Sequence, residues 1–219
     1  MSLCRYKDLC IDATDAAALA TFWGAALGLD VRRLDDGDAL LSGATKEQAV
    51  WVNTVPEPRS VKHRLHLDIH TGSVSALVDL GATVVDDTSF PWTVMTDPEG
   101  GEFCAFVRDE PPETRIYELV LDCADPERIA TWWAEVLGGR LEGEAEQWGL
   151  EEIPGAPFEY LVFVKVPEPK SAKNRVHLDL TTPDLGALTA AGATVLAELE
   201  SWTVLADPEG NEFCAFPES

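Results

Sequence analysis

Two short segments of the chain combine a histidine with an aspartate two residues later: His66 with Asp68, and His177 with Asp179. Alternation along a strand predicts that each pair shares one face and points into a cleft. A histidine beside an aspartate can be held in one tautomer and act as an acid, a base or a donor to a ligand. The alternative is a structural hydrogen-bonded pair. These two pairs are the strongest markers of a candidate site.

Four tryptophans are candidates for the walls of such a cleft, because flat rings stack on aromatic or cationic ligands: Trp51, Trp92, Trp148 and Trp202. The other three fall on apolar stripes with helical spacing, which predicts positions in the core: Trp23, Trp132 and Trp133.

Six of the 16 basic residues lie in two short segments: Arg59, Lys62, Arg64, Lys170, Lys173 and Arg175. One interpretation is an anion site or a fixed salt-bridge network at the mouth of the cleft. The other is simple pairing with the acidic surface around them, which contributes little stability.

The elements that must position these residues occur twice, because residues 9–107 recur in order at 119–217. A repeat of this length predicts two copies of one fold with two equivalent sites. The predicted domains span residues 4–107 and 115–219. Residues 108–114 form a charged, proline-containing linker between them.

Each copy divides again into two units that begin alike. Residues 8–12 alternate as a strand, Asp15 caps a helix, and Gly28 ends it. The pattern restarts at residues 66–70, followed by a helix over 73–80. Residues 49–55, 92–95 and 102–107 are predicted strands. The unit is therefore a strand, a helix and about three strands, used four times, in an α+β fold.

Four motifs carry a resemblance to the vicinal-oxygen-chelate superfamily, the glyoxalase/bleomycin-resistance/dioxygenase group. They are Asp-x3-Leu-Ala-x-Phe-Trp with Leu-Gly (residues 15–28), Val-Pro-Glu-Pro leading to Lys-x-Arg-x-His-Leu-Asp (55–68), Gly-Ala-Thr-Val (81–84), and Trp-Thr-Val-x-x-Asp-Pro-Glu-Gly-x-Glu-Phe-Cys-Ala-Phe (92–106). Each has a counterpart in the second copy. The resemblance implies tandem glyoxalase-like domains, each of two paired βαβββ modules that form a curled mixed sheet around a cleft.

The resemblance also suggests metal-ligand positions, although it does not preserve the usual ligands. The first-strand histidine of metal-using members falls on Asp8 and Glu118, and the closing glutamate falls on Cys104 and Cys214. The second-module histidine is kept. Within one copy the sets are Asp8/His66/Cys104 and Glu118/His177/Cys214, and an exchange of modules between copies swaps the carboxylates. Each trio offers donors that Zn²⁺ or Fe²⁺ accepts. The alternative is buried thiols that fill space.

The usual ligand quartet is broken, and we therefore expect a glyoxalase/bleomycin-resistance-like protein that binds a small organic molecule in its clefts without a metal or another cofactor. The alternative is a metal-dependent lyase, isomerase or dioxygenase that acts on a small vicinal-oxygen substrate with Zn²⁺ or Fe²⁺. A third hypothesis, an interaction scaffold, would leave the clefts without a ligand.

The net charge of −23 argues against nucleic acid and anionic membranes as partners. It indicates either an acidic cleft that attracts a cationic molecule or a uniformly acidic, solubilising surface. Five cysteines without Cys-x-x-Cys pairs, and no long apolar segment, predict a cytoplasmic protein with reduced thiols. With four modules in one chain, we expect a monomer that contains an internal pseudo-dimer, or a homodimer.

Overall fold

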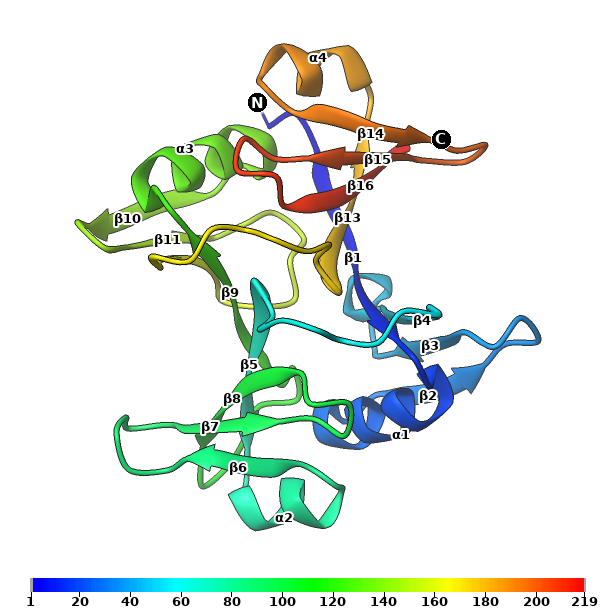
Figure 1. Cartoon of the computed structure of the whole chain (residues 1–219), viewed down its shortest axis with the longest axis vertical. Helices are drawn as coiled ribbons and strands as arrows, with labels where there is room; N and C mark the ends of the chain where they lie inside the picture. Colours follow the sequence, from blue (N-terminus) through cyan, green and yellow to red (C-terminus); the bar gives the residue numbers. More distant parts are fainter. Residues whose placement is uncertain (1, 219) are drawn as a thin grey trace.

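The structure, a computed structural model, describes residues 2–218, and these form four βαβββ modules as the sequence predicts (Figure 1). Ser219, which ends the predicted second domain, lies outside the described residues. Module 1 contains β1 (Arg5–Ala13), α1 (Ala16–Leu27), β2 (Asp30–Arg33), β3 (Ala39–Ser42), a 3-10 turn (Lys46–Gln48) and β4 (Val50–Thr54). Module 2 contains β5 (Leu65–Thr71), α2 (Val74–Asp79), β6 (Thr83–Asp86), β7 (Thr93–Thr96) and β8 (Glu102–Val107).

The second repeat supplies the other two modules. Module 3 contains β9 (Ile116–Cys123), α3 (Pro126–Leu137), β10 (Arg140–Glu144), β11 (Gln147–Glu151) and β12 (Tyr160–Lys165). Module 4 contains β13 (Val176–Thr182), α4 (Leu185–Ala190), β14 (Thr194–Glu198), β15 (Thr203–Ala206) and β16 (Glu212–Pro217). None of the helices between residues 2 and 218 has the length and hydropathy to cross a membrane.

The modules pair across the repeats rather than within them. Sheet A has the order β14-β15-β16-β13-β1-β4-β3-β2 and joins module 4 to module 1. Sheet B has the order β10-β11-β12-β9-β5-β8-β7-β6 and joins module 3 to module 2. Figure 1 shows the N-terminal strand β1 beside β13 of the last module. Each sheet is curled and contains parallel and antiparallel pairs, which confirms the expected α+β fold.

The helices begin and end where the sequence indicates. The Asp15 carboxylate accepts a hydrogen bond from the Ala18 amide at the start of α1, and Gly28 ends this helix at φ +71°, a left-handed conformation that favours glycine. Asp125 caps α3 in the same way.

Aromatic side chains of the two long helices fill the core. Trp23 of α1 packs on Phe103 of β8 at 5.2 Å, and Trp133 of α3 packs on Phe213 of β16 at 5.5 Å. Each helix therefore joins its own module to a strand of the opposite sheet. The core positions predicted for Trp23, Trp132 and Trp133 are confirmed, since all three are buried.

Candidate functional site

The centre of sheet A carries the first candidate site, where β1 and β13 run antiparallel. Their register places Asp8 opposite Asp179 and Cys10 opposite His177. The intervening residues of β1, such as Leu9, are buried in the hydrophobic core. Because alternate residues of a strand face the same side, the four polar side chains gather on the face away from that core.

A β-bulge adds Lys7 to this face. The register between β1 and β13 shifts between Tyr6 and Asp8, and a bulge of this kind redirects a side chain. The Lys7 ammonium lies 2.5 Å from Asp8 Oδ2 and 4.3 Å from the ring centre of Phe216. A cation is thereby placed on the Asp8 carboxylate at the edge of the site.

A cavity of about 440 Å³ opens over these residues. Its size is in the range of small-molecule sites. Trp51 rises from β4 as one wall, and Trp202 stacks on Phe216 at 5.7 Å as another. The remaining lining residues are Lys7, Cys10, Asp12, Asp38, Asn53, Lys173, His177, Asp179, Leu199, Val204, Glu212 and Cys214.

Two carboxyl groups face one another at the base of the cavity. Burial raises the pKa of Asp179, and the neighbouring charge of Asp8 together with a hydrogen bond between the two groups raises it further. Asp8 also accepts a hydrogen bond from Trp51 Nε1 at 3.2 Å. The raised pKa of Asp179 and the Lys7 ammonium beside Asp8 both reduce the negative charge at the base of the cavity.

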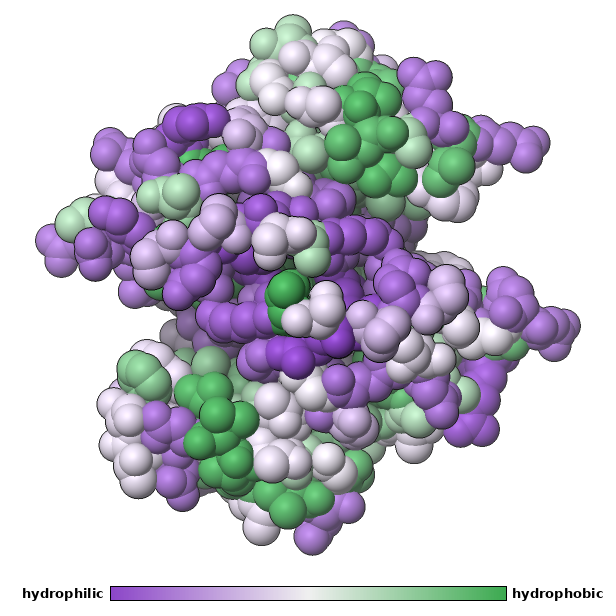
Figure 2. All heavy atoms as spheres, viewed as in Figure 1, coloured by the Kyte–Doolittle hydropathy of each residue, from purple (hydrophilic) through white to green (hydrophobic). Residues whose placement is uncertain are grey.

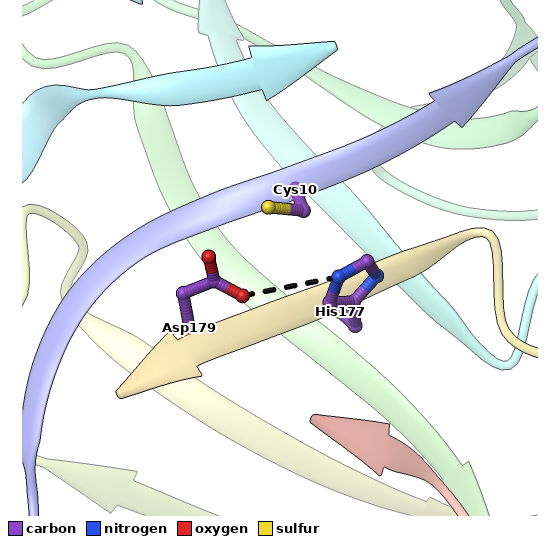
Figure 3. A group of neighbouring side chains, drawn as sticks. All are labelled: Cys10, His177 and Asp179. Atoms are coloured by element: carbon purple, nitrogen blue, oxygen red, sulfur yellow. Dashed lines mark ion pairs between the residues drawn. The ribbon is translucent and has the colours of Figure 1, made fainter. Parts of the chain in front are cut away.

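Cys10, His177 and Asp179 form a compact group in which one donor atom of each lies within 4.8 Å of the others (Figure 3). His177 Nε2 lies 3.8 Å from Asp179 Oδ1. Burial lowers the pKa of His177 and raises the pKa of Cys10 well above its ordinary value. The imidazole and the thiol are therefore both neutral near pH 7, and they present hydrogen-bonding groups to the cavity.

Sheet B carries the equivalent arrangement. Asp68 lies opposite Glu118 and beside Cys104, and His66 Nδ1 is 2.9 Å from Asp68 Oδ1. Burial raises the pKa of Glu118, and the charge of Asp68 raises it further. Here the bulge exposes Tyr117 where sheet A has Lys7. The carboxyl pair of sheet B consequently has no lysine or arginine within 4.0 Å among the described residues.

A row of aromatic rings lies on the equivalent face of sheet B. Tyr117 packs on Phe106 at 5.1 Å, Phe106 stacks on Trp92 at 5.3 Å, and Trp92 stacks on Phe90 at 5.1 Å. The two pseudo-equivalent sites have therefore diverged. Sheet A has a lysine beside its carboxyl pair and a cavity above it. Sheet B has a carboxyl pair without a lysine or arginine within 4.0 Å among the described residues, and a row of aromatic rings beside it.

The donor atoms of sheet B fit a divalent metal. His66, Asp68 and Cys104 offer nitrogen, oxygen and sulfur within 4.8 Å of one another, and Glu118 stands opposite Asp68. This donor set is one that Zn²⁺ accepts. A divalent ion would also neutralise a carboxyl pair that otherwise needs a shared proton. Sheet A has less need of an ion, because Lys7 occupies its carboxyl pair.

The structure places the predicted site residues as follows. The predicted metal candidates come onto one sheet from both repeats, Asp8, His177 and Cys214 on sheet A and Glu118, His66 and Cys104 on sheet B. The groups whose donor atoms lie within 4.8 Å of one another are different sets, Cys10, His177 and Asp179 on sheet A and His66, Asp68 and Cys104 on sheet B. Trp51 and Trp202 line the sheet A cavity, whereas Trp92 belongs to the aromatic row of sheet B. The expectation for Trp148 is wrong, because this ring packs against the hydrophobic core.

Sequence reasoning missed Lys7, Tyr117 and the role of Cys10. A bulge leaves no mark in the alternation, so Lys7 and Tyr117 gave no signal. Cys10 did give one, since it alternates with Asp8 and Asp12 on the polar side of its strand.

The two basic segments mostly line a second cavity between the sheets, and only Lys173 of their six basic residues also lines the sheet A cavity. Five of their six residues pair with carboxylates, as the salt-bridge interpretation expects: Arg59 with Glu102, Lys62 with Asp122, Lys170 with Glu212, Lys173 with Asp12 and Arg175 with Glu99.

A sequence profile described as "Glyoxalase-like domain" matches this chain twice, over residues 8–106 and 118–216. The chain belongs to the glyoxalase-like domain family. The matched ranges of this glyoxalase-like protein include both carboxyl pairs and the two site histidines, His66 and His177. A search of curated protein sequences returns no significant match.

Solved structures share the fold of this glyoxalase-like protein at low sequence identity. Glyoxalase I from Zea mays is 15% identical with a TM-score of 0.70, and the match covers 98% of this chain and 92% of that one. A putative dioxygenase from Bacillus subtilis is 10% identical with a TM-score of 0.66, covering 99% and 86%. The cppA protein from Streptococcus pneumoniae is 11% identical with a TM-score of 0.55, covering 99% of both chains. These matches show that the fold is shared.

Proposed function

We propose that this protein binds a small, planar and largely apolar organic molecule in the sheet A cleft, without a metal ion. The observation that carries the proposal is the cavity of about 440 Å³ between Trp51 and Trp202, with His177, Cys10 and Asp179 at its base. Flat rings on the walls favour a planar ligand. The neutral imidazole and thiol at the base would fix its orientation through hydrogen bonds.

The charges of the sheet A site support binding without a metal. The Lys7 ammonium lies 2.5 Å from Asp8 Oδ2, and burial and the charge of Asp8 raise the pKa of Asp179 to about 7, which favours a protonated Asp179 below that pH. A protonated carboxyl group donates one hydrogen bond and accepts others, so the base of the cavity can recognise a carbonyl or hydroxyl group of the ligand.

The proposal is tested by a thermal-shift screen of aromatic and heteroaromatic compounds in the presence of EDTA, followed by calorimetric titration of the hits. Trp202→Leu removes a wall of the sheet A cleft, and we expect it to weaken binding about tenfold, a loss of about 1.4 kcal/mol. The matched control is Trp92→Leu, which changes the equivalent ring of sheet B and should leave the affinity unchanged.

Three results would contradict this function: a screen without any stabilising compound, hits whose effect disappears with EDTA, or hits that weaken with Trp92→Leu and not with Trp202→Leu. Both tryptophans are partly exposed, so neither replacement opens a buried cavity in the core.

A second candidate function is metal-dependent chemistry at sheet B. It is favoured by one observation, the group His66, Asp68 and Cys104 beside a carboxyl pair that no lysine or arginine of residues 2–218 neutralises. A divalent metal at these residues would act as a Lewis acid toward vicinal oxygens of a substrate, as in a lyase, isomerase or dioxygenase. Tyr117 and Phe106 would then hold the substrate against this position and exclude water.

Titration of the EDTA-treated protein with Zn²⁺ tests this second function. We expect one tight site that Cys104→Ser weakens and the pseudo-equivalent Cys214→Ser does not. Equal effects of the two replacements, or no tight site, would rule out a metal centre at sheet B.

A further inference from the structure

A second cavity, of about 560 Å³, lies between the two sheets beside the site proposed above, with which it shares Asp12 and Lys173. Two pseudo-equivalent loops form it, residues 55–64 and 166–175, which connect the two halves of each repeat. Four pairs of charged groups in the lining are pseudo-equivalent: Lys62 and Lys173, Arg64 and Arg175, Asp12 and Asp122, Glu57 and Glu168. Arg59 also lines the cavity, and its counterpart Lys170 does not. The cavity therefore has approximate twofold symmetry.

The lining of this central cavity contains slightly more basic than acidic side chains, whereas the whole chain is strongly acidic. Five basic side chains stand against four carboxylates in the lining, in a protein whose net charge is −23. Figure 2 shows hydrophilic side chains across the middle of the molecule, between the two ends of the view. Four of these basic groups pair with carboxylates, and Arg64 is the one without an ion pair among the described residues. An arginine without an ion pair in the lining is a candidate contact for an anion.

Arg64 lacks the ion pair that its counterpart has. Arg175 lies 3.3 Å from the Glu99 carboxylate, whereas Arg64 has no carboxylate within 4.0 Å among residues 2–218. The acid equivalent to Glu99 is Glu209, which instead accepts hydrogen bonds from the amides of Ala124 and Asp125. The symmetry of the charges is broken at Arg64.

The guanidinium of Arg64 is also incompletely hydrogen-bonded. Its Nη1 donates to the Glu168 carbonyl at 2.6 Å, but its Nε is buried and has no acceptor. The Nε of Arg59, in the same lining, is buried without an acceptor as well. A buried donor without a partner lowers stability. An anion in the cavity would supply the negative charge that the Arg64 guanidinium lacks.

We propose that the central cavity binds a small dianion that carries its two charges at opposite ends. Arg64 and Lys62 would hold one end, and Arg175 and Lys173 would hold the other. A guanidinium fork matches the two oxygens of a carboxylate or a phosphate. The ligand chemistry is therefore that of a dicarboxylate or a diphosphate of about the size of the cavity.

The test is calorimetric titration of the protein with sodium pyrophosphate and, separately, with glutarate, at one fixed ionic strength. We expect saturable binding of at least one of the two anions, with one site per chain. The acidic protein as a whole repels anions, so saturable binding indicates a specific site. Arg64→Gln should weaken binding at least tenfold. The matched control is Arg32→Gln, on exposed strand β2 and outside the cavity, and it should change the affinity less than twofold.

The two anions distinguish the ligand source: pyrophosphate alone indicates a phosphate ligand, and glutarate alone indicates a dicarboxylate. No saturable binding of either anion to the unaltered protein would overturn the proposal, as would equal effects of Arg64→Gln and Arg32→Gln. If Arg64→Gln does not fold by circular dichroism, Arg64→Lys replaces it. Arg64→Lys keeps the positive charge but loses the two-pronged guanidinium donor. If this variant weakens binding less than twofold, Arg64 does not hold the anion as proposed.

Discussion

The loop that reaches the central cavity contains a histidine whose counterpart is an asparagine, and this difference allows a sharp test of the local physics. Asn174 donates to Asn211, and Asn211 donates to both oxygens of Asp207 at 3.2 and 3.0 Å. In the first repeat these two asparagines are replaced by His63 and Gly101. Asp97 accepts hydrogen bonds from the backbone amides of Glu99 and Gly101, and position 101 has no side-chain amide to donate to it.

Burial shifts the two titratable groups of this first-repeat cluster in opposite directions. It raises the pKa of Asp97 to about 6 and lowers the pKa of His63 to about 4. Between pH 4 and 6, unfolding therefore moves one proton from Asp97 to His63 and changes the total number of bound protons little. Stability from this pair should be nearly independent of pH in that window.

His63→Asn removes the group that takes up a proton on unfolding, and Asp97, which releases one, remains. Asp97 still keeps a proton that the unfolded chain has lost, so the free energy of unfolding must fall as pH rises from 4 to 6. The slope is about 1.4 kcal/mol per pH unit for one proton, which is about 2 kcal/mol between pH 4.5 and 6. Urea unfolding followed by tryptophan fluorescence measures this difference against the unaltered protein, in which all other carboxyl groups contribute equally.

Gly101→Asn completes a double-mutant cycle. A Cβ at position 101 would lie 2.7 Å from His63 Cε1 and 2.7 Å from Asp97 Oδ2, so the single variant should lose about 1–3 kcal/mol. Combined with His63→Asn, the new amide can donate to Asp97 as Asn211 donates to Asp207. We expect a favourable coupling of at least about 1 kcal/mol and a flatter pH profile. Additive free energies, or a pH profile that His63→Asn leaves unchanged, would refute this reasoning.

Three further predictions follow from other contacts. Lys173→Met should weaken ligand binding in the sheet A cleft severalfold, because Lys173 and its partner Asp12 line this cleft as well as the central cavity. Lys62→Met should leave this binding unchanged, because Lys62 lines the central cavity and not the cleft. Calorimetric titration of both variants with a ligand from the screen measures the difference. Glu99→Gln should lower the free energy of unfolding by about 1 kcal/mol more than Glu209→Gln, since only Glu99 also pairs with Arg175; urea unfolding measures this difference, and equal losses would contradict it. Burial raises the pKa of Cys4 to about 11 and that of Cys123 to about 12, and raises the pKa values of the other three thiols as well. A thiol reagent at pH 8 should therefore modify less than one cysteine per native chain and all five in urea.

The fold was largely predictable because each element has a local signal. Alternation in residues 8–12 and 66–70 fixed which side of a strand faces the core, and Asp15 and Gly28 fixed the ends of a helix. The pairing of modules had no such signal. Equivalent modules present the same apolar faces to either partner, so the sequence left both pairings open, and only the register of β1 with β13 decides between them.

The site was predictable where it depends on alternation and not where the backbone departs from it. His177 and Asp179 share a face as expected. Lys7 has the same parity as the buried Leu9, and only the bulge brings its side chain to the polar face. Trp148 has the same parity as the buried Leu150, a signal for the core that outweighs its aromatic character.

Native mass spectrometry of the purified protein with a screened aromatic ligand, recorded before and after EDTA treatment, tests the central claim most directly. We predict one organic molecule per chain in the Trp51–Trp202 cleft, no metal mass in that complex, and the same occupancy after EDTA. A complex that always carries a metal ion, or that loses its ligand when EDTA is added, would contradict metal-free binding at sheet A.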